Sequence, residues 1–172
     1  MPDPPSWIIE KLDKRHDRAA FSCGVKELDT YLHRFAGQNE KSGISQHFVA
    51  VATAGEGGIL GYYALSAGSV VFELVPDHLK KRLPRYPVPV AHIGRLAVDR
   101  SMQGRGLGED LLIDALARIA RVADEIGIHA VEVVAINGSA RRFYLKYGFT
   151  ALADDERHLY LPLAAVRKLG LP

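Results

Sequence analysis

The stretch QGRGLGEDLL, at residues 103–112, has the composition that most directly suggests chemistry. Its glycines lack a Cβ atom, so the backbone N–H groups of Gly104, Gly106 and Gly108 could approach a phosphate closely. The leucine-rich pattern that follows predicts a helix, whose N-terminus adds a positive dipole end at the same place. Arg105 could add a charge-assisted hydrogen bond. The stretch therefore predicts a loop that holds a pyrophosphate.

Two common nucleotide-binding motifs do not fit this loop. A P-loop requires GxxxxGK[ST], and no such stretch occurs in the chain. A Rossmann fingerprint requires GxGxxG, but its third glycine position is Glu109 when counted from Gly104, and Leu111 when counted from Gly106. What remains is the pattern QxxGxG, directly after an apolar strand pattern and before a long helical one.

This QxxGxG pattern resembles motif A of the GCN5-related N-acetyltransferases (GNATs), which bind the pyrophosphate of acetyl-CoA in this way. Downstream, ARRFYLKYGF at residues 140–149 resembles the FYxxxGF element of the same superfamily. The resemblance implies acetyl-CoA as the co-substrate, with no metal. It also implies an α/β fold with a mixed central sheet, splayed at the acetyl-CoA site and flanked by helices.

Four segments resemble the toxin branch of this superfamily: FSCGVKELDTYL, GYYALS, LPRYPVPV and GRLAVDRSMQGRGLG. The similarity extends from about Phe21 to Leu163. It implies a cytoplasmic enzyme that acetylates the α-amino group of aminoacyl-tRNA and blocks translation. A small DNA-binding antitoxin would be its partner, and a homodimer is expected. The alternatives are acetylation of a small-molecule amine or a protein N-terminus, and a catalytically silent acetyl-CoA-binding module.

The resemblance also implies roles for individual residues. Tyr144 matches the tyrosine of FYxxxGF and would be the general acid, since a phenol with a reference pKa of about 10 can protonate a coenzyme A thiolate. Tyr147 is the second candidate for the general acid. The backbone of the strand before the glycine loop would hold the pantetheine and polarise the thioester carbonyl. The expected cofactor-binding residues are Leu96, Ala97, Val98, Gln103, Gly104, Arg105, Gly106, Leu107, Gly108 and Asn137, the last of which could instead simply cap a helix.

A general base is harder to identify. No glutamate lies in the middle of the strand pattern at residues 91–99, where lysine-acetylating relatives often have one. A lysine substrate, with a reference pKa of about 10.4, needs help to lose its proton, whereas an α-amino group at about 7.7–8.0 needs little. The missing glutamate therefore agrees with an aminoacyl ester substrate. His92 or a water molecule could still accept the proton.

Clusters of basic residues could form a rim that binds the phosphates of RNA. Solvated charges on the surface are an equally good interpretation of the sequence. Arg95 lies inside an apolar strand pattern and should therefore have a partner, either the acceptor end of tRNA or a structural carboxylate. The candidate substrate-binding residues are Arg95, Lys80, Lys81, Arg82, Arg85 and Arg142, with Arg100, Arg141 and Lys146 nearby in the sequence.

The overall composition is that of one globular domain, spanning residues 1–172. Hydrophobic residues make up 48% and charged residues 24% of the chain, and the net charge of +2 does not by itself indicate a nucleic-acid partner. The single cysteine, Cys23, cannot form an internal disulfide, and we expect a structural role for it. The N-terminus does not have the pattern of a signal peptide, and no apolar run is long enough to span a membrane.

The periodicity of apolar residues predicts an alternation of strands and helices. An amphipathic helix with Leu28, Tyr31, Leu32 and Phe35 on its apolar face is expected at 24–43. The proline-rich stretch 75–90 should contain no long regular element. The expected strands are 6–12, 46–53, 57–71, 91–99, 128–136 and 158–163, a turn is expected at 53–58, and further helices are expected at 105–126, ended by Gly127, and at 137–149.

Overall fold

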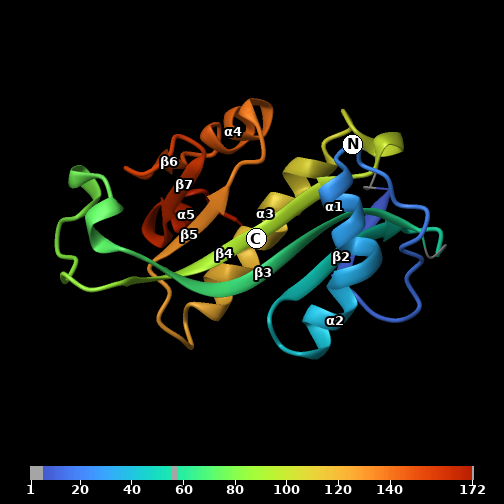
Figure 1. Ribbon diagram of the computed structural model, residues 1–172, viewed down its shortest axis with the longest axis horizontal. Helices are drawn as coiled ribbons and strands as arrows, with labels where there is room; N and C mark the ends of the chain where they lie inside the picture. The colour runs from blue at the N-terminus through green and yellow to red at the C-terminus, as the bar shows by residue number, and fades with distance from the viewer. Residues whose placement is uncertain (1–5, 56–57, 172) are drawn as a thin grey trace. The chain divides into compact units, whose positions relative to one another are not determined.

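Seven strands pair in the order β1-β2-β3-β4-β5-β7-β6 in a computed structural model, which describes residues 6–55 and 58–171 (Figure 1). The β1/β2, β2/β3, β5/β7 and β6/β7 pairs are antiparallel, and β4/β5 is parallel. The sheet is therefore mixed, as predicted. The strands are β1 (Trp7–Lys11), β2 (Gln46–Ala52), β3 (Ile59–Val70), β4 (Val88–Val98), β5 (Ala130–Val134), β6 (Thr150–Ala151) and β7 (His158–Pro162).

The chain forms two compact units, which are described separately. The first unit comprises Met1–Leu65 and Arg95–Ala115, and the second comprises Ser66–Gly94 and Leu116–Pro172. Strands β3 and β4 and helix α3 (Leu107–Val122) run through both units.

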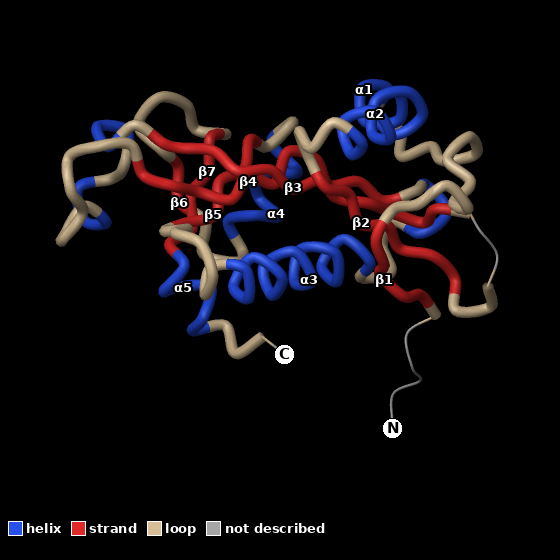
Figure 2. Tube along the Cα trace, turned by 90° about the horizontal axis from the view of Figure 1, so that it is seen from below, coloured by secondary structure: helices blue, strands red, loops and turns tan. Residues whose placement is uncertain are grey.

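In the first unit, helices cover both faces of the strands. Figure 2 shows α1 (Lys26–Thr30) and α2 (Ala36–Lys41) on one face and the start of α3 on the other. Two neighbouring residues of β3 show this division. The hydroxyl of Tyr62 donates to the carbonyl of Leu28 in α1 at 2.7 Å, whereas a Cβ atom on Gly61 would lie 2.9 Å from Leu111 in α3. Glycine at position 61 thus allows α3 to pack closely against β3.

A π-helical segment, η1 (Tyr31–Phe35), joins α1 to α2, so the predicted helix is one continuous helical run over residues 26–41. Tyr31 and Leu32 are buried, as predicted. Phe35 is 49% exposed, and Ala36 is buried in its place. The wider turn of a π-helix shifts the buried face by one residue, because its hydrogen bonds join residues i and i+5.

In the second unit, the end of β3 and the strands β4, β5 and β7 contribute to an apolar cluster. The cluster comprises Val70, Val75, Val88, Val90, Ala130, Leu152 and Tyr160, and side chains from the proline-rich stretch pack against it. That stretch contains only the short 3₁₀ helix η3 (Asp77–Leu79) before β4 begins at Val88, three residues earlier than predicted. A second 3₁₀ helix, η2 (Phe72–Leu74), precedes the stretch. The helices α4 (Gly138–Leu145) and α5 (Leu163–Lys168) complete the unit.

Several predicted boundaries differ from the observed ones. Helix α3 ends at Val122 and not at Gly127, and Ile126 is 55% exposed. Strand β5 ends at Val134, which is 57% exposed, and does not extend to residue 136 as predicted. The strand β6 and the helix α5 were not predicted. The predicted turn at 53–58 and the start of the strand at 57 include residues 56–57, which lie outside the described part of the chain.

Tyr160 has an unusual hydroxyl group. Within the described residues it is the one buried side-chain oxygen or nitrogen without a hydrogen-bond partner, and burial raises its pKa to about 12. Burying an unpaired hydroxyl costs free energy. We expect Tyr160→Phe to leave the free energy of unfolding unchanged, or to raise it by up to about 2 kcal/mol. Urea denaturation measures this, and a loss of more than about 1 kcal/mol would show that the hydroxyl has a partner.

Candidate active site

The glycine loop connects β4 to α3 in the first unit. Gly104 and Gly106 have φ angles of +78° and +87°, which residues with a side chain rarely adopt. No other part of the described chain lies within 4 Å of the position of a Cβ on either glycine. The amides of the first helical turn have no partner within the helix, whereas Asp110 donates to the carbonyl of Gly106 at 3.1 Å. The loop therefore presents open backbone next to a helix N-terminus, which suits an anionic phosphate group.

Gln103 anchors the start of this loop. Its side-chain amide nitrogen donates to the carbonyl oxygens of Cys23, at 2.8 Å, and Val98, at 3.0 Å. Asp99 makes two further hydrogen bonds. Its carboxylate accepts from the backbone N–H of Ser22 at 2.9 Å, and its own backbone N–H donates to the carbonyl of Leu60 at 2.8 Å. Gln103 thus supports the loop, and the contact with the cofactor that we predicted for it stays a prediction.

The end of β4 lies directly before the loop. Ala97 is buried in the core of the first unit, whereas Leu96 and Val98 are half-buried. The carbonyl of Ala97 would lie 3.0 Å from a Cβ on Gly61, so β3 approaches this strand closely. That the backbone of these three residues holds the pantetheine stays a prediction.

Arg95 has an aromatic partner. Its guanidinium carbon lies 3.6 Å from the centre of the Tyr31 ring, which is a cation–π contact. The sequence predicted a carboxylate or RNA as the partner of Arg95 and did not predict an aromatic ring; a contact with RNA stays a prediction. The Tyr31 hydroxyl lies 2.7 Å from Nε2 of His47 and 3.0 Å from Oγ of Ser45, and it accepts from Asn39 at 3.1 Å.

His47 fixes the orientation of the Tyr31 ring. It is fully buried, and its Nδ1 lies 2.6 Å from a carboxylate oxygen of Glu40. Burial lowers the pKa of His47 more than Glu40 raises it, so the imidazole is neutral at neutral pH. Its Nδ1–H then donates to Glu40, and its Nε2 accepts from the Tyr31 hydroxyl. Arg95 consequently lies against a ring held by a buried hydrogen-bond network, which keeps the guanidinium in a fixed position.

Tyr144 lies in α4 of the second unit. Asn137 caps this helix, as predicted, because its side chain accepts from the backbone N–H of Ala140 at 2.8 Å. The Tyr144 ring is 5% exposed and packs edge-on against Phe143 and Phe149. Burial raises the pKa of Tyr144, so the phenol stays protonated over the physiological range. The same shift makes transfer of its proton harder than the reference pKa suggests.

The candidate RNA-binding residues of the second unit differ in how they are held. Lys80 forms an ion pair with Asp77 at 3.3 Å and lies over the ring of Phe72. The nearby Arg141 donates to the carbonyl of Glu156 at 2.9 Å. The exposed candidates are Lys81, Arg82, Arg85 and Arg142.

A chain of four titratable side chains in the second unit was not predicted from the sequence. His92 in β4, Glu132 in β5 and His158 in β7 are joined by hydrogen bonds, and Asp154 extends the chain. The one member of this chain that the sequence analysis had named is His92, as a possible proton acceptor.

Within residues 6–55 and 58–171, no group of three or more His, Cys, Asp or Glu side chains could hold a metal ion. No helix in the described part of the chain is long and apolar enough to cross a membrane.

Residues 44–151 match the acetyltransferase (GNAT) domain family. The tRNA-acetylating toxin of Mycobacterium tuberculosis (strain ATCC 25618 / H37Rv) is 40% identical over 159 residues, which cover 92% of this chain and 93% of that protein. AtaT complexed with acetyl-methionyl-tRNAfMet has a TM-score of 0.89 and 29% identity, over 95% of this chain and 99% of AtaT. A tyrosine-to-phenylalanine mutant of the AtaT toxin, bound to the C-terminus of the antitoxin AtaR and acetyl-CoA, has a TM-score of 0.82 and 26% identity, over 98% of this chain and 100% of that one.

The family match covers the strands β2 to β5 and the glycine loop, together with α3 and α4. It therefore includes the loop that presents open backbone amides, the strand before it, and the buried tyrosine of α4. The curated relative extends this agreement over nearly the whole chain. By sequence, fold and site, the chain belongs to the GNAT family of acetyltransferases.

Proposed function

We propose that this protein transfers the acetyl group of acetyl-CoA to the α-amino group of aminoacyl-tRNA and acts in the cytoplasm as a translation-blocking toxin. The observation that carries this proposal is the 40% identity, over almost the full length of both chains, to a tRNA-acetylating toxin. The structure supplies a physical basis for an RNA substrate in Arg95, whose planar cation is held in place on Tyr31. Such a guanidinium suits bidentate recognition of a phosphate.

The reaction we propose is direct transfer. The backbone amides of the glycine loop bind the pyrophosphate of acetyl-CoA, and the backbone N–H groups at Leu96–Val98 stabilise the oxyanion that forms on the thioester carbonyl. The neutral amine attacks this carbonyl, the carbon–sulfur bond breaks, and Tyr144 protonates the departing thiolate. We further propose that a small DNA-binding antitoxin binds the protein in the cell, and that the protein forms a homodimer.

The decisive experiment uses purified protein, labelled acetyl-CoA and bulk aminoacylated tRNA, with deacylated tRNA as the control. We expect label on the aminoacyl group in the charged sample only. Identification of the labelled aminoacyl groups then gives the preferred tRNA. Bound acetyl-CoA without transfer to any charged tRNA would contradict the proposed substrate, and a small-molecule amine or a protein N-terminus would then have to be the acceptor.

Substitution of Arg95 tests its role in binding RNA. We expect Arg95→Leu to raise the KM for aminoacyl-tRNA about tenfold, because loss of one charge-assisted contact costs about 1.5 kcal/mol. The dependence of this KM on salt concentration should become weaker, since one fewer phosphate is neutralised. The KM for acetyl-CoA should stay the same. Steady-state kinetics at several salt concentrations measure all three quantities.

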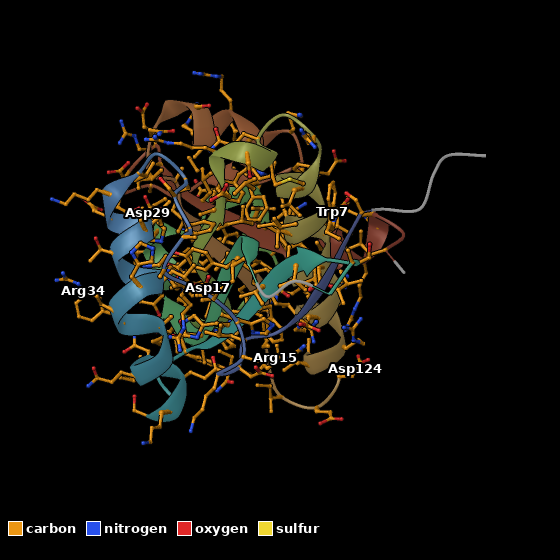
Figure 3. The ribbon with its side chains drawn as sticks, turned by 90° about the vertical axis from the view of Figure 1, so that its right-hand side faces the viewer. Trp7, Arg15, Asp17, Asp29, Arg34 and Asp124 are labelled. Atoms are coloured by element: carbon orange, nitrogen blue, oxygen red, sulfur yellow. The ribbon has the colours of Figure 1, made fainter. Side chains whose placement is uncertain are left out.

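Arg34 provides a matched control for Arg95. It lies in η1 close to Tyr31 in the sequence, but its side chain is exposed and points away from the helix (Figure 3). We expect Arg34→Leu to leave the KM for tRNA within about twofold of the wild-type value, as is usual for a surface substitution. Equal effects of the two substitutions would show that the Arg95 effect reflects general charge and not a specific contact.

A further inference from the structure

A hydrogen-bonded chain of four titratable side chains joins β4, β5 and β7 in the second unit. Nδ1 of His92 lies 2.9 Å from one carboxylate oxygen of Glu132, and Nε2 of His158 lies 2.5 Å from the other. Nδ1 of His158 lies 2.9 Å from a carboxylate oxygen of Asp154. Packing alone does not need such a chain, because each charged group loses solvation when it is buried.

The protonation of this chain follows from its partners. Burial by itself would raise the pKa of Glu132, but the hydrogen bonds from His92 and His158 outweigh burial and hold the pKa below its usual value. Glu132 is therefore ionised at neutral pH and can only accept hydrogen bonds. Nδ1 of His92 must then carry a hydrogen, so a His92 ring with a single hydrogen has its lone pair on Nε2. The tautomer of His92 is thus the one that a proton acceptor needs.

His158 is the cationic member of the chain. Its two ring nitrogens face two carboxylates, those of Glu132 and Asp154, so both nitrogens donate. Burial would lower the pKa of His158, but these two carboxylates together raise it. The imidazolium of His158 compensates part of the negative charge beside His92. The carboxylate of Glu132 is consequently held in place from both sides, with its charge directed at Nδ1 of His92.

The position of His92 in β4 leaves its side chain partly exposed. His92 pairs with Glu132 near the end of the parallel pairing of β4 with β5, which stops one residue later, at Ile93 and Val133. A Cβ on Gly94 would lie 3.6 Å from Nε2 of His92, so this ring nitrogen lies beside a residue that has no side chain. The His92 side chain is 30% exposed, compared with 13% for Glu132. Asp154, at the other end of the chain, is 41% exposed, so both ends of the chain are more accessible than its middle.

We propose that His92 accepts the proton of the acceptor amine, and that Glu132, itself held by His158 and Asp154, positions His92 for this step. This proposal rests on the proposed transfer to an amine. The amine nitrogen forms a bond to the acetyl carbon and its proton passes to Nε2 of His92, while the carbon–sulfur bond breaks and the thiolate takes a proton from Tyr144. Exchange with solvent then removes one proton from His92 and returns one to Tyr144. Glu132 and His158 are positioning residues, since they act through His92.

Substitution of His92 tests the proton-accepting role. We expect His92→Ala to lower the single-turnover rate of acetyl transfer about 100-fold at neutral pH, the usual size of a general-base effect. The affinity for acetyl-CoA should not change, which also shows that the variant is folded. Added imidazole should restore part of the rate in proportion to its neutral form. An unchanged rate, or a loss that imidazole does not restore at any pH, would overturn the proposal.

Substitution of Glu132 tests the positioning role with a different measurement. Glu132→Gln replaces the carboxylate with a neutral amide of similar shape, which no longer stabilises an imidazolium at position 92. The acid limb of the pH–rate profile should therefore move to lower pH, and the maximal rate should fall. A purely structural role would lower the rate without moving this limb. A matched control is His78→Ala, which removes an exposed histidine of the same unit and should leave both the rate and the profile unchanged.

A measurement without substrate separates this proposal from the proposed function. Nitrogen-15 NMR of labelled wild-type protein should show His92 with the hydrogen on Nδ1 and a bare Nε2 at neutral pH, and Glu132→Gln should remove this preference. The opposite tautomer in the wild-type protein would overturn the proposed base. Failure of wild-type protein to acetylate charged tRNA, with the predicted tautomer present, would overturn the tRNA substrate alone. His92 would then be tested by the same substitutions on the amine that does accept acetyl.

Discussion

Replacement of Tyr144 by phenylalanine is expected to lower kcat at least about 100-fold, since proton transfer by a positioned side chain contributes about 10² to 10⁴ to a rate. The substitution removes only the hydroxyl. The ring contacts with Phe143 and Phe149 remain. The fold and the affinity for acetyl-CoA should therefore be unchanged. Single-turnover kinetics together with calorimetric titration of acetyl-CoA measure both quantities.

Tyr147 provides the control for this prediction. Its ring also packs edge-on against Phe143, at 5.5 Å, but it is only half-buried. We expect Tyr147→Phe to keep kcat within about twofold of the wild-type value. If Tyr144→Phe turned over normally and Tyr147→Phe did not, the general acid would be Tyr147. Normal turnover in both variants would remove tyrosine from the mechanism, and water would then have to protonate the thiolate.

Introduction of a branched side chain into the glycine loop should have the largest effect on acetyl-CoA. We expect Gly106→Val to weaken acetyl-CoA binding about 100-fold, equivalent to about 3 kcal/mol, or the loss of one to two hydrogen bonds to a charged group. Two causes act together. The φ angle of +87° is unfavourable for valine, so the loop changes conformation, and the side chain occupies the space where a phosphate would approach. Calorimetric titration gives the affinity.

Gly43 separates these two causes. Like Gly106 it has a positive φ angle, of +76°, and no other described residue comes within 4 Å of the position of its Cβ, but it follows helix α2 and not β4. Gly43→Val should lower the free energy of unfolding by an amount similar to Gly106→Val, of order 1–3 kcal/mol. Its affinity for acetyl-CoA should remain that of the wild type. A matched loss of affinity would mean that global destabilisation, and not the loop, explains the result.

The amphipathic patterns of the sequence predicted the main elements, because apolar spacing reports directly on which residues are buried. The helical run at 26–41 was found in this way. The π-helical segment within it was not, since one wider turn changes only the register of the following residues. The exposure of Phe35 and the burial of Ala36 follow from that single shift. The two-residue strand β6 and the six-residue helix α5 are too short for periodicity to be visible.

The candidate site was predictable to the extent that it is local in the sequence. The glycine loop and the capping by Asn137 each depend on residues a few positions apart. The partner of Arg95 was not predictable, because position 31 meets position 95 only through the packing of a helix on a strand. The same holds for His92, Glu132 and His158. Three separate strands bring these side chains together, and strand register cannot be derived from the spacing of 40 and 26 residues between them.

The hydrogen bond from the Gln103 side chain to the carbonyl of Cys23 has a consequence for the chemical stability of the protein itself. It places the single thiol of the chain close to the loop that we expect to hold the pyrophosphate of acetyl-CoA, whose other end is a reactive thioester. Thiols exchange with thioesters only as thiolates. Burial, reinforced by the carboxylate of Asp29, raises the pKa of Cys23 to about 11, so the thiolate is scarce at neutral pH. The protein can therefore work with an acyl donor for many turnovers without becoming acylated on its own sulfur.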